Sequence, residues 1–253
     1  MKKLLRKLRL VPDERAEAEK RRAERKKQAF AVPNARLTYE EMMAGLLSKH
    51  DPDIAMSLAV GGDYEAMGET LRQLLESYGL RENHYLIDVG CGSGRLAYAL
   101  SRSSYRETLR YLGIDIVPAM LQYAAAKCQQ PSWRFELAAE LKIPEADGCA
   151  DMLCFFSVFT HLMQEESFLY LREAARVLKQ GGVIVASYLD INEPRHWKTF
   201  AGNVASAKTR QAKAMDIFLS PDFFSVWARQ LGLTLLDEPE RDCGQRVCLL
   251  QKR

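Results

Sequence analysis

The sequence predicts a doubly wound α/β domain. After residue 81, short apolar runs bounded by turn residues recur, and helical segments separate several of them. The first run leads directly into a glycine-rich turn that is followed by a helical pattern. Strands that alternate with helices need right-handed crossovers, so the sheet should be mostly parallel and covered by helices on both faces.

We expect seven strands in this sheet. They are Tyr85–Val89, Tyr111–Ile114, Trp133–Leu137, Met152–Phe156, Val183–Ser187, Leu233–Leu236 and Arg246–Leu250. Helices are predicted over Pro118–Cys128 and Glu165–Leu178, the second stopped by the turn residues Gly181 and Gly182. The stretch 237–245 between the last two strands is too short for a crossover helix, so they should form an antiparallel hairpin. The sheet would then contain one antiparallel strand.

A helical cover should precede the sheet. The stretch 38–80 carries two apolar clusters at helical spacing, separated by Gly61, Gly62 and Tyr64. Two alternatives remain for these glycines, a simple loop or a hinge that lays Tyr64 over a ligand. Pro33 disfavours helix at the residue before it. The sequence therefore predicts a tail over 1–29, a helical cap region over 30–80 and a main domain over 81–253.

Charge is distributed unevenly along the chain. Residues 1–29 hold 12 Lys/Arg and 5 Asp/Glu, whereas residues 30–253 hold 24 and 28. Strong nucleic-acid binders usually carry a basic domain surface, so the mildly acidic body argues against a large nucleic-acid substrate. The six cysteines form no CxxC pair and the sequence lacks the roughly 20 apolar residues of a membrane span. We expect reduced thiols and a cytoplasmic protein.

The basic tail allows two interpretations. Leu4, Leu5 and Leu8 share one side of a helix, and five basic residues crowd the rest of residues 1–9. Such a segment can lie on an anionic membrane surface, but the mixed charges of 13–27 also suit a solvated helix. Weak, peripheral contact with the inner face of the membrane is the hypothesis that we carry forward.

The sharpest motif is the run from Leu86 to Leu96, LIDVGCGSGRL. A strand that enters such a turn lets the backbone approach a ligand closely, and free N–H groups at the helix start attract an anion. The spacing is GxGxG with Asp88 two residues before the first glycine, unlike the GxGxxG of dinucleotide enzymes. Asp115 ends the next strand, where a carboxylate can accept hydrogen bonds from ribose hydroxyls. Together these residues predict a nucleoside pocket.

From about residue 60 onward, the chain resembles the class I S-adenosylmethionine-dependent methyltransferases of the small-molecule type. The resemblance rests on DVGCGSGR, the acid at 115, and the stretches 157–162, 170–178 and 181–185. It implies a Rossmann-like fold and S-adenosylmethionine as cofactor. It also implies contacts with the methionine end, the ribose and the adenine from Asp88, Gly90, Cys91, Gly92, Asp115 and Ile116. Many members carry Gly-Asp-Ala after the third strand, where this chain offers Ala139 or Glu140 instead.

Methyl transfer to a hydroxyl or carboxyl needs a group that takes the proton or stabilises the anion, and histidine suits this task. His161, after the fourth strand, is the first candidate, with a helix-capping role as its alternative. His196, in the loop after the fifth strand, is the second. Phe155 and Phe156 are aromatic candidates for facing the sulfonium, or core residues. We include Phe156 among the residues that bind the cofactor.

Absent motifs narrow the methyl acceptor. No Asp/Asn-Pro-Pro-Tyr follows the fourth strand and no Pro-Cys pair is present, which argues against base methylation of nucleic acids. No carboxylate cluster for a metal is evident, since Asp190 and Asn192 alone are a weak signal. The favoured function is methylation of oxygen or nitrogen on a small molecule or glycan precursor. Its alternatives are a protein or ribosome methyltransferase, and a non-catalytic partner that binds S-adenosylmethionine.

Overall fold

The computed structural model describes residues 35–138, 140–209, 216–236 and 243–253. The chain divides into two units, Met1–Ala35 and Arg36–Arg253. The expected tail over 1–29 lies outside the described residues, and so does the membrane contact predicted for it. Within the described ranges, no helix combines the length and apolar character that crossing a membrane requires.

The seven predicted strands are all present in one mixed sheet. They are β1 (Tyr85–Val89), β2 (Arg110–Asp115), β3 (Arg134–Leu137), β4 (Ala150–Phe155), β5 (Leu178–Asp190), β7 (Leu233–Leu236) and β8 (Arg246–Lys252). Their order is β3-β2-β1-β4-β5-β8-β7, and the short β6 (Phe218–Leu219) extends the edge of β5. β8 runs antiparallel to both β5 and β7, which confirms the predicted hairpin and the single reversed strand.

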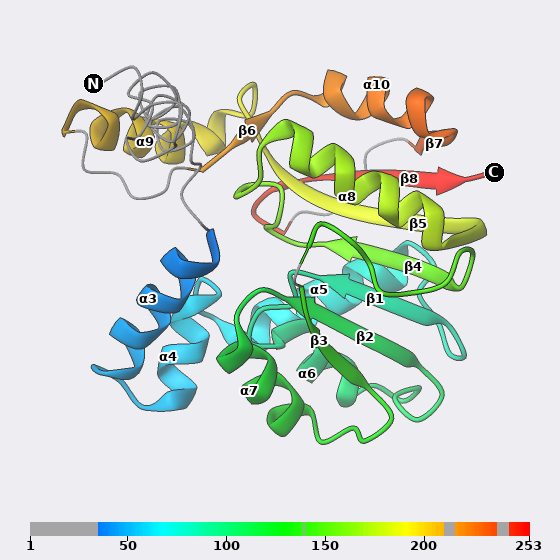
Figure 1. Ribbon diagram of the computed structural model, residues 1–253, viewed down its shortest axis with the longest axis horizontal. Coiled ribbons are helices and arrows are strands. Elements are labelled where there is room, and N and C mark those ends of the chain that lie inside the picture. The colour runs from blue at the N-terminus through cyan, green and yellow to red at the C-terminus, as the bar shows by residue number, and fades with distance from the viewer. Residues whose placement is uncertain (1–34, 139, 210–215, 237–242) are drawn as a thin grey trace, which may run out of the picture. The chain divides into compact units, whose positions relative to one another are not determined.

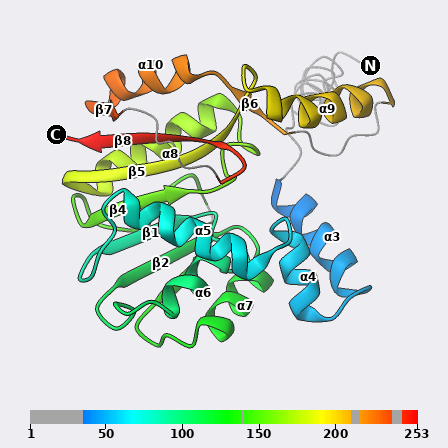
Figure 2. The ribbon, with the colours of Figure 1, turned by 180° about the vertical axis from the view of Figure 1, so that it is seen from behind.

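Helices cover both faces of the sheet (Figures 1 and 2). They are α5 (Tyr64–Ser77), α6 (Arg95–Ser101) and α7 (Pro118–Cys128) on one face, and α8 (Gln164–Val177) and α10 (Pro221–Leu231) on the other. The alternation of β1 shows the division, because Leu86 packs with α5 and α6 while Ile87 packs with α8. Each fully buried large apolar side chain stabilises the folded state by about 1.5–3 kcal/mol, so both helix layers stabilise the sheet. Helices on both faces of a mostly parallel sheet confirm the predicted doubly wound α/β fold.

The stretch that was expected to be a helical cover contains α3 (Ala35–Leu47) and α4 (Pro52–Ala59) before α5. Met43 of α3 and Met56 of α4 are buried with Val117 and Met120, which lie after β2 and at the start of α7. We call α3 and α4 the cap helices. They pack beside the carboxyl end of β2, which is the edge where the glycine-rich turn lies.

The helix before β5 ends within one residue of its predicted end, but Gly181 and Gly182 do not form the turn that was expected to stop it. α8 ends at Val177, and β5 already begins at Leu178, so Gly181 and Gly182 lie inside the strand. A Cβ on Gly182 would come within 2.7 Å of Leu178 Cδ1 and 2.9 Å of the Asp151 carbonyl oxygen. The glycine therefore permits close packing at the start of the strand, where the register between β4 and β5 shifts.

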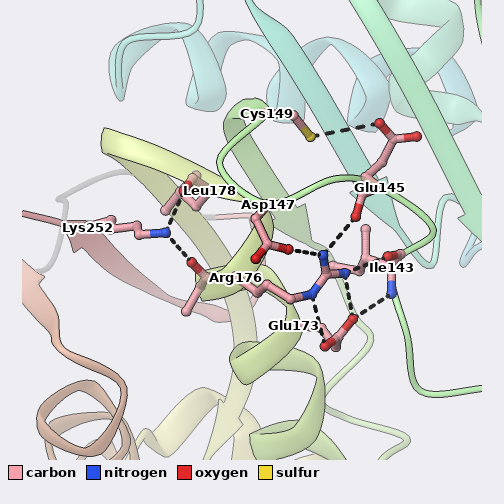
Figure 3. A network of polar contacts seen from close by, with 9 residues as sticks. Ile143, Glu145, Asp147, Cys149, Glu173, Arg176, Leu178 and Lys252 are labelled. Carbon is pink, nitrogen blue, oxygen red and sulfur yellow. Dashed lines mark hydrogen bonds and ion pairs between the residues drawn. The ribbon is translucent and has the colours of Figure 1, made fainter.

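Arg176, in the last turn of α8, fastens that helix to the connection before β4 (Figure 3). Its guanidinium donates to the carbonyls of Ile143 and Glu145 at 2.9 and 2.8 Å, and to the carboxylates of Asp147 and Glu173 at 2.7 and 2.8 Å. Arginine's rigid fork suits several acceptors at once. The network lies at the amino end of β4, at the opposite edge from the glycine-rich turn.

We expect Arg176→Ala to lower the free energy of unfolding by about 1–3 kcal/mol, because two backbone carbonyls and two carboxylates lose their donor. Urea unfolding measures this loss. Arg106→Ala is the matched control, since Arg106 makes an exposed pair with its neighbour Glu107 and should contribute less than about 0.5 kcal/mol. Equal stability of the two variants would contradict the fastening role of Arg176.

Candidate active site

The glycine-rich turn connects the carboxyl end of β1 to α6. Gly90 and Gly94 have φ angles of 75° and 82°, which side chains rarely allow. A methyl group on Gly90 would overlap Val158, and one on Gly94 would overlap Ala124 of α7. The Gly90 amide donates to the Ile114 carbonyl at 2.7 Å and fixes the turn against β2. The turn therefore brings backbone against its neighbours at a distance that side chains would prevent.

Asp115 ends β2 and faces this turn. Its Oδ2 accepts the Gly92 amide at 2.8 Å, and its Oδ1 accepts the Val117 amide at 2.9 Å. Burial raises the pKa of Asp115, and these backbone hydrogen bonds oppose the rise. Each oxygen keeps further acceptor capacity. The carboxylate can therefore shape the turn and still accept hydrogen bonds from a pair of hydroxyls.

Asp88 lies deeper than its predicted role implied. Tyr111 donates its hydroxyl to Oδ2 at 2.8 Å, and the Cys154 thiol donates to Oδ1 at 3.4 Å. Burial raises the pKa of Asp88 to about 6, and the hydrogen bonds from Tyr111 and Cys154 oppose that rise. Both oxygens thus already have protein donors beneath the turn.

The residues expected near adenine lie at the ends of β2 and β3. Ile116 is partly buried against the cluster of the cap helices. The Ala138 amide donates to the Asp115 carbonyl at 2.8 Å, which ties the end of β3 to the site. Ala139 lies outside the described residues. Glu140 is exposed and pairs with Lys142 at 3.1 Å.

Three hydrogen bonds join the glycine-rich turn and the first residue of α6 to α4, to the loop after it and to the start of α5. The Ser93 hydroxyl donates to the Met56 carbonyl at 2.9 Å, and Arg95 donates to the Val60 carbonyl at 2.6 Å. In the other direction, the Tyr64 hydroxyl donates to the Ser93 carbonyl at 2.7 Å. The cap region is therefore fastened directly onto the turn.

Gly61 and Gly62 adopt φ angles of 92° and 80° in the loop between α4 and α5. Tyr64 follows at the first position of α5 and reaches the turn through its hydroxyl. The backbone here forms a loop, and Tyr64 contacts the protein's own turn, so a hinge that lays Tyr64 over a ligand stays a prediction.

The two phenylalanines at the end of β4 lie on opposite faces of the sheet. Phe155 stacks on Phe159 with ring centroids 5.0 Å apart, inside the core under α8. Phe156 is buried on the opposite face, in the cluster with α5 and α6. Ser157 then has a φ of 59° and donates its amide to the Ser187 hydroxyl at 2.8 Å. Such strain is typical of functional sites.

His161 lies in the turn after β4, with 40% of its side chain exposed. Tyr39 of α3 packs edge-on against its ring, with centroids 5.6 Å apart. Its Nδ1 is 4.0 Å from Oδ1 of Asp216. Partial burial lowers the pKa of His161, and the charge of Asp216 opposes this. No hydrogen bond from the ring to a helix end occurs among the described residues, so these contacts do not support the capping role.

Asp216 is held in place through the backbone. Asn203 of α9 (Trp197–Thr209) donates to the Asp216 carbonyl at 2.7 Å and accepts the Asp216 amide at 3.2 Å. The next amide, of Ile217, donates to the Thr160 carbonyl at 2.8 Å. The hydrogen bonds from Asn203 and to Thr160 thus hold the Asp216 carboxylate beside His161.

Comparisons with known proteins agree with this architecture. Residues 87–186 match a family described as methyltransferase domain. This match identifies residues 87–186 as a methyltransferase domain. Its fold resembles the magnesium protoporphyrin IX methyltransferase of Synechocystis PCC 6803, solved with bound SAH, at a TM-score of 0.63. That similarity covers 87% of this chain and 98% of the other at 13% sequence identity, which shows the fold.

Two curated relatives are similar in sequence. Malonyl-[acyl-carrier protein] O-methyltransferase of Hahella chejuensis is 32% identical over 41% of this chain and 36% of its own length. Ubiquinone biosynthesis O-methyltransferase of Nitrobacter winogradskyi is 26% identical over 60% of this chain and 58% of its own length. The chain therefore spans between about a third and three fifths of these relatives.

The sequence resemblance implies S-adenosylmethionine as the cofactor, and the magnesium protoporphyrin IX methyltransferase of similar fold was solved with bound SAH. The residues at the carboxyl ends of β1 and β2 fit it. Asp115 offers acceptors for a ribose, Ile116 offers an apolar surface beside it, and the glycine-rich turn offers close backbone. Asp115, Ile116, Gly90, Cys91 and Gly92 remain our proposed cofactor residues, and the cofactor contacts of Asp88 and Phe156 stay predictions.

His196 occupies a different environment from His161. It ends the short 3₁₀ helix η1 (Pro194–His196), and only 3% of the residue is exposed. Its Nδ1 accepts the Asp190 amide at 2.9 Å, and its Nε2 has no partner among the described residues. These contacts hold the turn after β5, and His196 is buried where His161 is 40% exposed.

Sequence reasoning missed Tyr39 and Asp216 as neighbours of His161. They come from segments far from it in the chain, and neither stands in a motif. The sequence does show two long connections that were not assigned to the parallel sheet, 38–80 and 189–221. Tyr39 lies in the first and Asp216 in the second. In this methyltransferase domain, both supply a side chain to the mouth of the site.

The pKa of Asp88 gives a pH-dependent prediction. Its folded value of about 6 lies above the unfolded value of about 3.9, so the folded state binds this proton more readily. The stabilisation is complete below about pH 4 and is lost as the pH rises through about 6. Between pH 7 and pH 4, the wild type should gain on the order of 2–3 kcal/mol in unfolding free energy relative to Asp88→Asn. Denaturant unfolding of both proteins across this range measures the gain, and a constant difference would contradict it.

Proposed function

We propose that this domain transfers a methyl group from S-adenosylmethionine to an oxygen or nitrogen of a small molecule. The observation that carries the proposal is one arrangement at one edge of the sheet. Asp115 accepts the Gly92 amide of the glycine-rich turn, and the turn bearing His161 lies against Gly90 through Val158. A binding group and a proton acceptor are thus neighbours.

When bound, S-adenosylmethionine would supply an electrophilic methyl group and would be left as a neutral thioether. The chain's own residues hold and orient. Asp115 accepts ribose hydroxyls while it keeps the Gly92 amide in place. His161 takes the proton of the acceptor on Nδ1 or Nε2, and the Asp216 carboxylate stabilises the resulting imidazolium.

The protonation of His161 and the charge of residues 30–253 favour a small methyl acceptor with a hydroxyl or an amine. A histidine with a lowered pKa is unprotonated at neutral pH, which suits removal of a proton from a hydroxyl or an amine. The acidic body, 24 Lys/Arg against 28 Asp/Glu over residues 30–253, favours a small acceptor over a nucleic acid. A glycan precursor meets these requirements.

The test is incubation of the full chain with labelled S-adenosylmethionine and fractionated lysate, followed by mass spectrometry of the labelled product. We expect release of S-adenosylhomocysteine and label on a small molecule. The control is Asp115→Ala, which should lose the product. Tight cofactor binding without any product would favour the alternative of a non-catalytic binding partner, and label on protein would favour a protein methyltransferase.

A further inference from the structure

The helix α9 presents two different faces. Its inner face carries Phe200, which packs edge-on against Phe218 of β6 with ring centroids 5.5 Å apart, and Asn203, which is bonded to Asp216. Figure 1 shows α9 beyond β6, on the far side of β5 from β1. Within the described ranges, Phe200 and Asn203 anchor this side of the helix, and Phe200 also contacts Trp197, with ring centroids 5.0 Å apart.

The outer face of α9 is apolar and exposed. Trp197 is 58% exposed and Val204 is 42% exposed. Ala201 and Lys208 are exposed as well. Positions i, i+4, i+7 and i+11 lie within one narrow stripe of a helix. We call these four residues the α9 stripe.

Basic residues accompany the α9 stripe without any acidic ones. The stretch 194–215 contains five Lys/Arg and no Asp/Glu, in a body whose residues 30–253 carry a net negative charge. Arg195 pairs with Glu193 at 3.0 Å, and Lys198 and Lys208 lie on α9 itself. Lys198 stands at the rim of the α9 stripe and is exposed, and Lys208 stands at its end. This local charge is opposite to that of the body around it.

We propose that the α9 stripe binds the surface of an anionic lipid bilayer. An interfacial helix combines an apolar face, an aromatic anchor and flanking Lys/Arg, and α9 has all three. Exposed Trp suits the boundary between headgroups and acyl chains. A nucleic acid would match the lysines but not the apolar stripe that runs between them.

The α9 stripe is connected to His161 through the inner face of the same helix. Asn203, on the inner face of α9, holds Asp216 beside His161. The lipid surface would thus lie near the mouth where an acceptor enters. The binding itself is independent of the proposed methyl transfer, because the tests below measure fluorescence and sedimentation only.

The three tryptophans make a position-specific test possible. Trp133 and Trp227 are 5% and 8% exposed, so Trp197 is the only one that faces solvent. With vesicles of phosphatidylcholine and phosphatidylglycerol at low salt, the emission of the full chain should shift to shorter wavelength. The shift should be absent with phosphatidylcholine alone, reverse at high salt and disappear in Trp197→Phe.

Co-sedimentation with the same vesicles tests the charges. Lys198→Glu with Lys208→Glu should lower the partition coefficient by about tenfold or more, since each basic residue near the surface contributes about 1 kcal/mol. The matched control is Arg81→Glu with Arg106→Glu, which changes the net charge equally at two exposed positions outside α9, before β1 and before β2. Vesicle binding without a Trp197 shift, equal loss in both double variants, or no binding by the wild type would overturn the proposal.

Discussion

Replacing His161 by alanine should lower the turnover number by about 10²–10⁴, with the affinity for S-adenosylmethionine almost unchanged. The reason is the position of the ring, which contacts Tyr39 and Asp216 at the mouth of the site and makes no helix cap among the described residues. Steady-state kinetics and calorimetry measure the two quantities.

The control for this prediction is His196→Ala. His196 is buried and accepts the Asp190 amide, so its loss should reduce the thermal midpoint and leave the turnover of the folded protein nearly intact. Full activity of His161→Ala would remove it as the base. A fall in stability alone would assign it a structural role.

Replacing Asp216 gives a second test of His161 as the base. Its charge raises the pKa of His161 against the effect of burial, so Asp216→Asn should lower that pKa further. Because the base acts unprotonated, the acid limb of the turnover profile should move to lower pH in this variant. A merely structural Asp216 would change the amplitude of the profile and leave its position alone.

Asp115→Ala should weaken the binding of S-adenosylmethionine by about 2–3 kcal/mol, since charge-assisted hydrogen bonds contribute roughly 1.5–3 kcal/mol each. This corresponds to about a hundredfold in dissociation constant. The variant also leaves the Gly92 and Val117 amides without their acceptor, so its stability should fall. Calorimetry on the folded fraction separates the two effects.

Glu140→Ala is the matched control for Asp115. Glu140 was one of two expected contacts near adenine, but it is exposed and pairs with Lys142. Its removal should change cofactor affinity less than about threefold, because exposed ion pairs contribute little. Unchanged affinity in a folded Asp115→Ala variant would exclude Asp115 from the site.

Much of the sheet was predictable because its strands are apolar runs between turn residues. The bounds of β1, β7 and α7 agree with the prediction residue by residue. β6 escaped prediction because Phe218–Leu219 is too short to show a period. The start of β5 was predicted five residues late because Gly181 and Gly182 have the composition of a turn, although they lie within β5 and Gly182 permits close packing there.

The site was predictable only where sequence order and spatial order agree. The glycine-rich turn follows β1, and Asp115 ends the adjacent strand β2, so a local sequence motif was enough to predict that they lie together. The neighbours of His161 come from α3 and from the segment before β6, and no local pattern marks a contact made by tertiary packing. For the same reason, the buried partners of Asp88 were not foreseen.

The fastening of the cap region has an evolutionary consequence. Ser93 and Arg95 both donate to main-chain carbonyls of the cap region, at Met56 and Val60. Because every residue type offers a carbonyl, side chains of the α3 to α4 region can diverge without breaking these two joints. New acceptor preferences can therefore arise in the cap while the cofactor turn stays constant, and grafting residues 35–60 from a relative is a practical route to altered specificity.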